Sequence, residues 1–302
     1  MKIFKFGGAS VKDASGVKNL LKVIKRKADS NTIVIVSAMG KTTNALENIV
    51  STYFNKKNNL NSGISELYDY HKIILENLFP DKHQIFNEIN ILFQRIKFFL
   101  ENNKSPNHSF VYDQVVTYGE IISTTIINSF LNHNNIESVW LDARDCIKTD
   151  SNYRGGNVQW AETQKNILNK IQKGKINVTQ GFIGSDKNNF STSLGREGSD
   201  YSAAIFAYSL NGESLTIWKD VPGVLNGDPK VFNNSRLLDQ ISYSEAIELA
   251  FYGASVIHPK TLQPLQKKEI PLYVKSFLNP DGNGTIISKG LDLIPKVPCY
   301  IF

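Results

Sequence analysis

Four short stretches of the sequence combine glycine with serine or threonine, which is the composition of loops that bind anions. These stretches read FGGAS, SAMGKTTN, GFIGS and SLGREGSD. Glycine lets backbone N–H groups approach a negatively charged ligand closely. None of the stretches has the GxxxxGK(S/T) or GxGxxG pattern of nucleotide-binding loops,. One such loop alone indicates only a tight turn, whereas four of them predict a ligand that carries phosphate.

A lysine stands close before the first loop. Lys5 lies near the end of KIFKF, a short apolar stretch that predicts a β-strand,. A cation beside exposed backbone donors stabilises the charge that moves between oxygens during phosphoryl transfer. The alternative is a lysine at a strand end whose ammonium group only reaches solvent.

The fourth loop holds the densest group of polar residues. Within eight residues of SLGREGSDY lie Ser193, Arg196, Glu197, Ser199 and Asp200. The planar fork of Arg196 can bind a carboxylate through two parallel hydrogen bonds, as lysine cannot. Ser199 or Asp200 could instead be an ordinary N-cap of the following helix. A cap accounts for one of these residues and leaves the rest of the group unexplained.

Strand and helix patterns alternate along most of the chain, and three of the four loops follow or overlap the ends of predicted strands. A continuous run of β-branched residues, as in TIVIVSA, is typical of a strand covered on both faces. We predict strands at 2–6, 32–38, 138–143, 176–184, 214–221 and 270–277, and helices at 13–29, 158–173, 201–210, 244–251 and 259–267. This alternation predicts an α/β fold with one doubly wound sheet. Such sheets bind ligands at the carboxyl ends of their strands.

The segment from about 43 to 133 has a helical pattern in four successive parts. Turn-forming residues separate these parts at 58–62, 80–81 and 104–107. We predict a helical hairpin inserted at about 60–105. Its broad apolar stripe should face a core, and it consists of Ile85, Ile89, Leu92, Phe93, Ile96, Phe99 and Leu100.

The composition is that of an ordinary globular protein. The chain has 302 residues, of which 41% are hydrophobic and 21% charged, and no window approaches the roughly 18 apolar residues of a membrane span. The net charge of +6 comes from scattered lysines and arginines, which suits acidic metabolites without predicting nucleic acid as a partner. Cys146 and Cys299 lack the spacing of a metal site, and the N-terminus lacks a signal-peptide pattern,. We therefore expect a cytoplasmic protein with reduced thiols and no membrane partner.

The chain resembles the aspartokinase branch of the amino acid kinase family in a series of motifs: KFGGAS, SAMGKTTN, YGE, GFIG, LGREGSDY, WKDVPGVLNGDPK and GASVIHPKTLQP. The resemblance implies a three-layer αβα sandwich with a mainly parallel central sheet, in a single catalytic domain over residues 1–302. An N-terminal lobe at about 1–195, which includes the helical insertion, would bind the amino acid. A C-terminal lobe at about 196–302 would bind the nucleotide.

The resemblance also implies a reaction. An aspartokinase transfers the γ-phosphoryl group of ATP to the side-chain carboxylate of L-aspartate, giving 4-phospho-L-aspartate for lysine, threonine and methionine biosynthesis. An aspartate side chain has a pKa near 4, so it is already an ionised nucleophile and needs no general base. The barrier is the repulsion between this carboxylate and ATP, which calls for lysine, backbone N–H groups and Mg²⁺. The Mg²⁺ would be held mainly by phosphates and water, without a metal site made by the protein.

The resemblance assigns residue roles at matching positions. Lys5 would contact the transferred phosphoryl group, and Asp200 would organise Lys5. Arg196 would bind the α-carboxylate of aspartate and Glu120 its α-ammonium group. Further residues would line the acceptor site (Thr43, Phe182, Ser193 and Ser199), the phosphate loop (Gly7, Gly8 and Ser10) and the nucleotide site (Trp218, Lys219, Asp220, Gly223 and Lys230).

The sequence departs from the family at several positions. Ala9 replaces a threonine beside the phosphate loop, Leu225 replaces a common tyrosine, and Ser255 replaces a lysine. Lys219 replaces a threonine, and we hypothesise that it supplies the charge missing at Ser255. The sequence ends where the regulatory ACT domains of typical aspartokinases begin, so the resemblance implies a catalytic domain without them, with a homodimer through this domain as the expected assembly.

Two other functions stay open at this point. The first is the same fold and reaction with a different carboxylate acceptor. The second is a catalytically impaired homologue that binds nucleotide or amino acid as a partner or regulatory subunit. The substitutions favour the impaired homologue, whereas Lys5, Arg196 and Asp200 favour an active enzyme.

Overall fold

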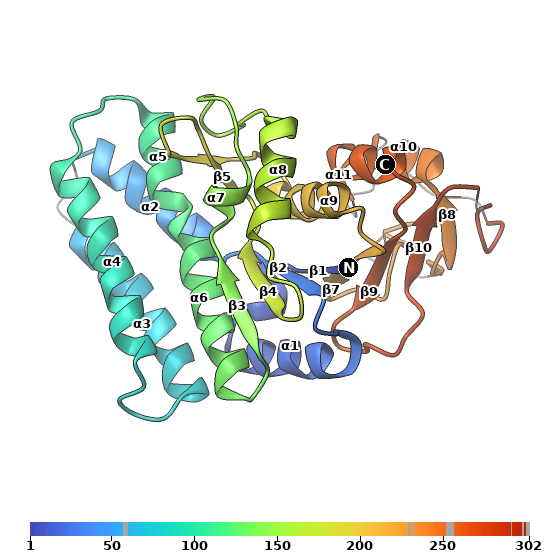
Figure 1. Ribbon diagram of the computed structural model, residues 1–302, viewed down its shortest axis with the longest axis horizontal. Helices are drawn as coiled ribbons and strands as arrows, with labels where there is room; N and C mark the ends of the chain where they lie inside the picture. Colours follow the sequence, from blue (N-terminus) through green and yellow to red (C-terminus); the bar gives the residue numbers. More distant parts are fainter. Residues whose placement is uncertain are drawn as a thin grey trace.

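The computed structural model describes residues 1–56, 60–228, 231–232, 234–251, 257–290, 292–297 and 299. In this part of the chain, eight strands form one sheet in the order β3-β4-β2-β1-β7-β9-β10-β8 (Figure 1). Neighbouring strands are parallel except for the pair β9 and β10. The strands are β1 (Lys2–Phe6), β2 (Thr32–Val36), β3 (Ser138–Leu141), β4 (Ile176–Gln180), β7 (Ser214–Lys219), β8 (Gln240–Ser242), β9 (Leu272–Ser276) and β10 (Thr285–Ser288). The predicted α/β fold with a mainly parallel central sheet is therefore confirmed.

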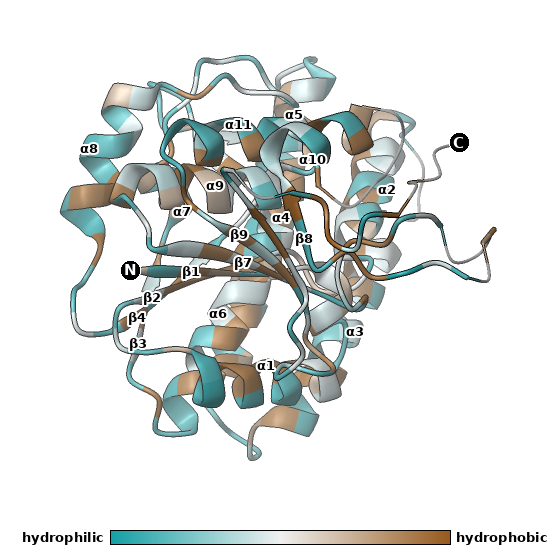
Figure 2. Cartoon of the chain, turned by 90° about the vertical axis from the view of Figure 1, so that its right-hand side faces the viewer, coloured by the Kyte–Doolittle hydropathy of each residue, from teal (hydrophilic) through white to brown (hydrophobic). Residues whose placement is uncertain are grey.

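Two groups of helices contribute to the hydrophobic cores on the two sides of the sheet. Figure 2 shows α1 and α6 on one side of the strands and α8, α9 and α11 on the other. The first group is α1 (Ala14–Lys27), α2 (Thr42–Phe54), α3 (Leu60–Leu78), α4 (Ile85–Asn102), α5 (His108–Val116) and α6 (Tyr118–His133). The second group is α7 (Ala143–Cys146), α8 (Trp160–Lys170), α9 (Gly198–Leu210), α10 (Tyr243–Phe251) and α11 (Pro259–Lys267). The molecule thus has the three predicted layers.

Each face of the sheet contributes to a separate hydrophobic core, because successive residues of a strand point to opposite faces. On β1, Phe4 and Phe6 belong to the core under the first group of helices, whereas Ile3 belongs to the core under the second group. Lys5 follows Ile3 by two residues, so its side chain points to the same face of the sheet as that of Ile3. This is the face on which α9 lies.

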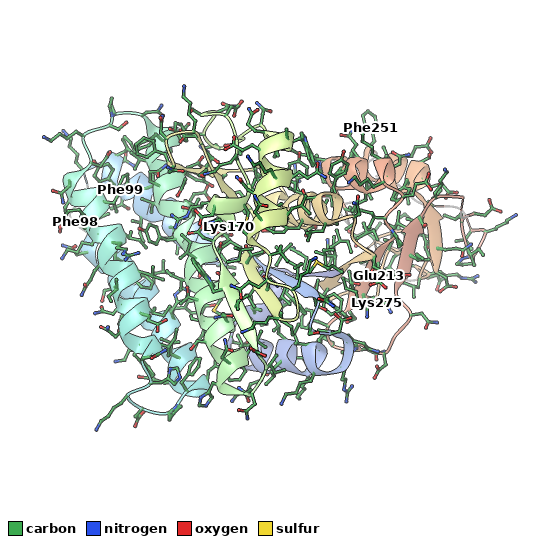
Figure 3. The ribbon with its side chains drawn as sticks, viewed as in Figure 1. Phe98, Phe99, Lys170, Glu213, Phe251 and Lys275 are labelled. Atoms are coloured by element: carbon green, nitrogen blue, oxygen red, sulfur yellow. The ribbon has the colours of Figure 1, made fainter. Side chains whose placement is uncertain are left out.

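The helices α3 and α4 form a pair at one end of the molecule (Figure 1). α3 packs on α2, and α4 packs on α6. Phe98 lies on the outer side of α4 and is 67% exposed (Figure 3). Most of the predicted apolar stripe is buried, namely Ile85, Ile89, Phe93, Ile96 and Leu100.

Some elements differ from those predicted. The last of the four helical parts predicted between about 43 and 133 is divided into two helices at Thr117. The hydroxyl of Thr117 donates to the carbonyl of Asp113 at 2.8 Å. The strand predicted at 176–184 ends at Gln180, because Phe182 has a left-handed φ of 68° that a strand cannot contain,. The chain then forms a separate hairpin of β5 (Ile183–Ser185) and β6 (Ser191–Ser193). This hairpin and the strands β8 and β10 were not predicted.

The helix predicted from Tyr201 begins three residues earlier, at Gly198. Glu197 occupies the N-cap position with a φ of 53°, and its side chain makes no capping hydrogen bond. Ser199 and Asp200 lie inside the first turn. The alternative that either of them is the N-cap is therefore wrong.

Candidate active site

The carboxyl ends of β1, β2, β4 and β7 meet at one edge of the sheet, as their parallel pairing requires. The first three glycine stretches follow β1, β2 and β4 at this edge. A cavity of about 540 Å³ opens there. It is lined by ten of the residues predicted from the sequence: Lys5, Gly8, Thr43, Glu120, Phe182, Ser193, Arg196, Ser199, Asp200 and Lys219. The structure thus brings the predicted acceptor residues and the predicted catalytic pair into one space.

Lys5 and Asp200 form a buried ion pair in the wall of the cavity. The Nζ atom of Lys5 lies 2.6 Å from Oδ1 of Asp200, and both side chains are less than 10% exposed. Lys5 comes from β1 and Asp200 from the first turn of α9. An unpaired charge in such a position would be costly. The pair therefore explains how a strand that is otherwise buried can hold an ammonium group at the cavity.

The first two glycine loops touch each other through their backbones. The N–H group of Gly40 donates to the carbonyl of Gly8 at 3.1 Å, and Gly40 has a left-handed φ of 54°. A Cβ atom on Gly8 would lie 2.6 Å from the carbonyl oxygen of Ala38. Real side chains do not approach a backbone oxygen this closely. Both positions therefore need glycine for the loops to meet.

Glu120 is a buried carboxylate of α6 that faces the same cavity. Its Oε1 atom accepts a hydrogen bond from the N–H group of Ala38 at 3.2 Å. Within the described part of the chain, its Oε2 atom has no hydrogen-bond partner. Burial raises the pKa of Glu120 to about 8, although hydrogen bonding from the backbone opposes the shift,. A buried carboxylate oxygen of this kind indicates a place for a cationic group of a ligand.

Asp113 of α5 fixes the position of Ser193 at the end of β6. Its Oδ1 atom accepts the hydroxyl of Ser193 at 2.7 Å, and its Oδ2 atom accepts the backbone N–H groups of Ser193 and Arg154, both at 2.9 Å. Burial raises the pKa of Asp113, and these hydrogen bonds oppose the shift. Asp113 therefore fixes the positions of two chain segments beside the cavity, those that contain Ser193 and Arg154.

The start of α9 packs closely on the turn that follows β4. A Cβ atom on Gly181 would lie 2.6 Å from Cβ of Ser199, and a Cβ atom on Gly198 would lie 2.8 Å from the ring of Phe182. The left-handed backbone of Phe182 brings its ring to this position. The two glycines thus permit the contact that places Phe182 and Ser199 together in the cavity wall.

Lys219 adds a second ammonium group to the cavity, at the end of β7. Burial lowers the pKa of Lys219, and the positive charge of Lys5 lowers it further. The carboxylates of Asp200, Glu197 and Asp220 act in the opposite direction. Lys5 and Lys219 thus place two amino groups in the wall of the cavity.

Other residues predicted for the nucleotide site do not line this cavity with their side chains. Trp218 is 2% exposed and stacks on Phe6 in the core, with the ring centroids 6.1 Å apart. The hydroxyl of Ser10 donates to the carbonyl of Trp218 at 3.4 Å. A Cβ atom on Gly223 would lie 2.5 Å from the hydroxyl of Thr285, so this glycine permits close packing.

The remaining nucleotide positions are only partly described. Gly7 precedes the short 3-10 helix η1 (Gly8–Val11), and Asp220 is exposed just beyond β7. Lys230 lies outside the described residues, as does Ser255. The hypothesis that Lys219 replaces the charge missing at Ser255 therefore stays a prediction.

Four polar residues that line the cavity were not assigned a site role from the sequence, namely Ser37, Tyr112, Arg154 and Glu197. The guanidinium of Arg154 lies 4.2 Å from the centroid of the Tyr112 ring, and its Nη2 atom is 3.7 Å from Oε1 of Glu47. Arg154 has a left-handed φ of 68°, which no hydrophobic pattern encodes. Glu197 also lines the cavity. Its Oε2 atom is buried without a hydrogen-bond partner in the described residues.

The described residues contain neither a metal-binding cluster nor a membrane-spanning helix. No group of three or more His, Cys, Asp or Glu side chains is close enough to hold a metal ion in the described ranges. In the same ranges, every helix falls short of the length and apolar character needed to cross a bilayer,.

The chain belongs to the amino acid kinase family, whose model matches residues 1–276. Within this family it is similar to aspartokinases. Lysine-sensitive aspartokinase 3 of Escherichia coli K12 is 30% identical over 297 residues, which cover 94% of this chain. The chloroplastic aspartokinase 1 of Arabidopsis thaliana is 30% identical over 305 residues, which cover 98% of it. The predicted family is therefore confirmed.

A solved structure of an aspartokinase has the same fold. The crystal structure of E. coli aspartokinase III in complex with aspartate and ADP matches with a TM-score of 0.88 and 30% identity, over 97% of this chain and 65% of that one. The chain spans 63% of the length of the E. coli relative and 53% of that of the Arabidopsis relative.

Proposed function

We propose that this chain catalyses the transfer of the γ-phosphoryl group of ATP to the side-chain carboxylate of L-aspartate. A carboxylate oxygen attacks the γ-phosphorus, the bond from that phosphorus to the bridging oxygen breaks, and ADP leaves. The observation that carries the proposal is the cavity that joins Glu120 and Arg196 with the buried Lys5–Asp200 pair. The aspartokinase relatives support the same acceptor.

The acceptor side of the cavity suits an α-amino acid. Arg196 would bind the α-carboxylate through its two-pronged guanidinium, and the Oε2 atom of Glu120 would accept hydrogen bonds from the α-ammonium group. Thr43, Ser193, Ser199 and Phe182 would surround the rest of the molecule. A substrate with both charged groups would satisfy Glu120, which burial otherwise disfavours in its ionised form,.

The phosphate side of the cavity suits a transferred phosphoryl group. At Gly8 and Gly40 the backbones of the first two glycine loops contact each other beside Lys5. Lys5 would bind the transferred group, Asp200 would hold Lys5 in place, and Lys219 would add positive charge. Stabilising this charge is the main requirement of phosphoryl transfer, since the acceptor is already ionised.

The nucleotide would lie beyond Lys219, where Asp220, Gly223, the backbone of Trp218 and Lys230 are proposed to contact it. Mg²⁺ would arrive with ATP, held mainly by phosphates and water, and Asp200 in the cavity wall offers one hard oxygen donor that fits it. Asp200 would be the residue that faces the ion. Mg²⁺ supplies neutralisation of phosphate charge.

We also propose the predicted organisation and location of the molecule. Residues 1–302 would act as one catalytic domain, with the amino acid bound by the lobe at about 1–195 and the nucleotide by the lobe at about 196–302. The free cysteines Cys146 and Cys299 support a reducing compartment such as the cytoplasm,. A homodimer through this domain stays a prediction.

A panel of acceptors in a hydroxylamine trap tests the proposed function, because only an acyl phosphate gives a hydroxamate. L-Aspartate should give a product with ATP and Mg²⁺. N-Acetyl-L-aspartate lacks the ammonium group that faces Glu120, and the α-amide of aspartate lacks the carboxylate that faces Arg196. Both should lose at least about a hundredfold in kcat/KM, because the first leaves the buried Oε2 atom of Glu120 unpaired, and the second lacks the charge that the Arg196 guanidinium would bind.

The panel also decides between the alternatives. Faster hydroxamate formation from another amino acid or carboxylate would show that this compound, and not aspartate, is the acceptor. ATP binding without any hydroxamate from the whole panel would show a catalytically impaired homologue.

A further inference from the structure

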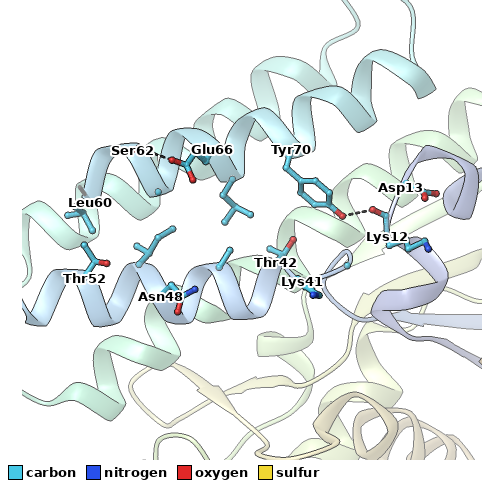
Figure 4. Close-up of a pocket in the computed structure, with 15 residues that line it drawn as sticks. Lys12, Asp13, Lys41, Thr42, Asn48, Thr52, Leu60, Ser62, Glu66 and Tyr70 are labelled. Atoms are coloured by element: carbon cyan, nitrogen blue, oxygen red, sulfur yellow. Dashed lines mark hydrogen bonds between the residues drawn. The ribbon is translucent and has the colours of Figure 1, made fainter. Parts of the chain in front are cut away.

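Tyr70, on the helical pair outside the sheet, reaches the first glycine loop. Its hydroxyl donates a hydrogen bond to the carbonyl of Lys12, directly after the 3-10 helix η1 that carries the first glycine loop (Figure 4). Burial raises the pKa of the Tyr70 hydroxyl, and the nearby charge of Asp13 raises it further. The hydroxyl therefore keeps its proton, and with it the hydrogen bond, throughout the neutral pH range.

The same hydroxyl lies against the second glycine loop. A Cβ atom on Gly40 would lie 2.6 Å from the Tyr70 hydroxyl oxygen. Gly40 itself donates its N–H group to Gly8 of the first loop. Tyr70 therefore touches both loops at the place where they meet.

The next residue of α3 contacts the start of α2. His71 is fully buried, with its Nε2 atom 3.4 Å from the hydroxyl of Thr42 and its Nδ1 atom 2.8 Å from the carbonyl of Leu67. Burial lowers the pKa of His71 to about 4, so its ring is neutral at neutral pH. Thr42 is followed directly by Thr43, which lines the active-site cavity. Two successive residues of α3, Tyr70 and His71, thus contact segments of the chain that lead into the active-site cavity.

The position of Tyr70 explains how the helical pair can serve the reaction without lining the cavity. Tyr70 and Gly40 line a groove of about 680 Å³ between α2 and α3. Gly40 also lines the active-site cavity on its other side. Tyr70 thus stands between the groove and the loops that would hold the phosphoryl group.

We propose that Tyr70 is a positioning residue, whose hydroxyl holds the two glycine loops in the arrangement that phosphoryl transfer requires. The proposal rests on the function proposed above. Phosphoryl transfer depends on placement, and a displacement of about 1 Å can reduce a rate by about a hundredfold. The charged acceptor contacts Glu120 and Arg196 lie on other segments of the chain, and only Thr43 of the acceptor site belongs to the loop that contains Gly40. Losing the Tyr70 hydroxyl should therefore lower kcat more than it weakens the binding of aspartate.

The test compares Tyr70→Phe with Tyr68→Phe. Both variants remove one hydroxyl from α3, but the ring of Tyr68 packs edge-to-face on Phe93, away from the loops. We expect Tyr70→Phe to lower kcat by about tenfold and to leave the KM for aspartate within about twofold. Tyr68→Phe should change neither constant.

Hydrogen exchange supplies a second measurement that needs no activity. The amide of Gly40 donates to Gly8, and the amide of Ser10 donates to Gly7. Losing the bond to Lys12 should speed the exchange of both amides by about fivefold in Tyr70→Phe. Tyr68→Phe should exchange as the wild type does.

The two measurements separate the possible failures. Equal kcat values for Tyr70→Phe and wild type would overturn the proposal, even if the melting temperature of the variant fell. A wild type that forms no aspartyl phosphate would overturn the proposed function instead. In that case the exchange rates alone decide whether Tyr70 holds the loops, and unchanged rates would overturn that role as well.

Discussion

The protonation state of Glu120 should change when aspartate binds. Burial raises the pKa of its carboxyl to about 8, so Glu120 is mostly protonated in the free protein at pH 7. The ammonium group of aspartate would favour the ionised form. Binding of aspartate at pH 7 should therefore release roughly one proton from Glu120.

The pH dependence of aspartate binding follows from this shift. Below pH 8 the free protein must lose the Glu120 proton before it binds the ammonium group, so KM for aspartate should fall by about tenfold per pH unit as the pH rises toward 8. Steady-state kinetics between pH 6 and 8 measure this slope, and calorimetry in two buffers measures the proton release. Glu120→Gln should bind more weakly, with no slope and no release. A wild-type KM that is constant over this range would contradict the assigned role of Glu120.

The two glycine loops are the elements that place the phosphate side of the site. Gly8→Ala would put a Cβ atom 2.6 Å from the carbonyl of Ala38 and so push the loops apart. We expect kcat to fall by at least about tenfold. Gly155→Ala is the matched control, because a Cβ atom there meets nothing within 4 Å. A Gly8→Ala variant that keeps the wild-type kcat would show that the contact between the loops is not needed.

Sequence patterns predicted the elements that are long or strongly periodic. The buried run of β2 and the apolar stripe of α4 were recognisable, and so were the glycine loops at the strand ends. The strands β8 and β10 have only three and four residues. Neither QIS, with one apolar residue, nor TIIS, with two adjacent ones, shows a clear period-2 pattern. The break at Thr117 carries no glycine or proline to mark it.

The candidate site was predictable as far as the family motifs reach. Residues in these motifs, such as Glu120 and Arg196, do line one cavity. Arg154 was missed because its place depends on a left-handed backbone and on a bond from its N–H group to Asp113. Tyr112 was missed because, in a helical pattern, an aromatic residue is typical of a core position. Trp218 was assigned to the nucleotide, whereas its side chain packs in the core.

At the scale of the whole molecule, the two cores share the central strands of one sheet. Leu20 of α1 lies in the core on one face, and Phe206 of α9 lies in the core on the other. Both side chains are at most 1% exposed. Because β1, β2 and β7 separate the two cores, we expect the proposed single domain to unfold as one unit.

Denaturant unfolding of two variants tests whether the domain unfolds as one unit. Leu20→Ala should lower the free energy of unfolding by about 2–5 kcal/mol and Phe206→Ala by about 3–5 kcal/mol, each within a single transition. Phe98→Ala, at a position that is 67% exposed, should have a much smaller effect. Two transitions, each sensitive to one variant only, would show that the faces fold independently.

Lys5 is proposed to stabilise the phosphoryl group during its transfer to aspartate, and substitution of this lysine tests that role most directly. Lys5→Met removes the charge that pairs with Asp200. Lys2→Met is the control, because Lys2 makes an exposed ion pair with Asp29 at the other end of the same strand,. With near-ultraviolet circular dichroism to check the fold, aspartyl hydroxamate formation should fall by at least about a hundredfold in Lys5→Met and stay unchanged in Lys2→Met. Equal aspartate-dependent turnover in Lys5→Met and wild type would contradict this role of Lys5.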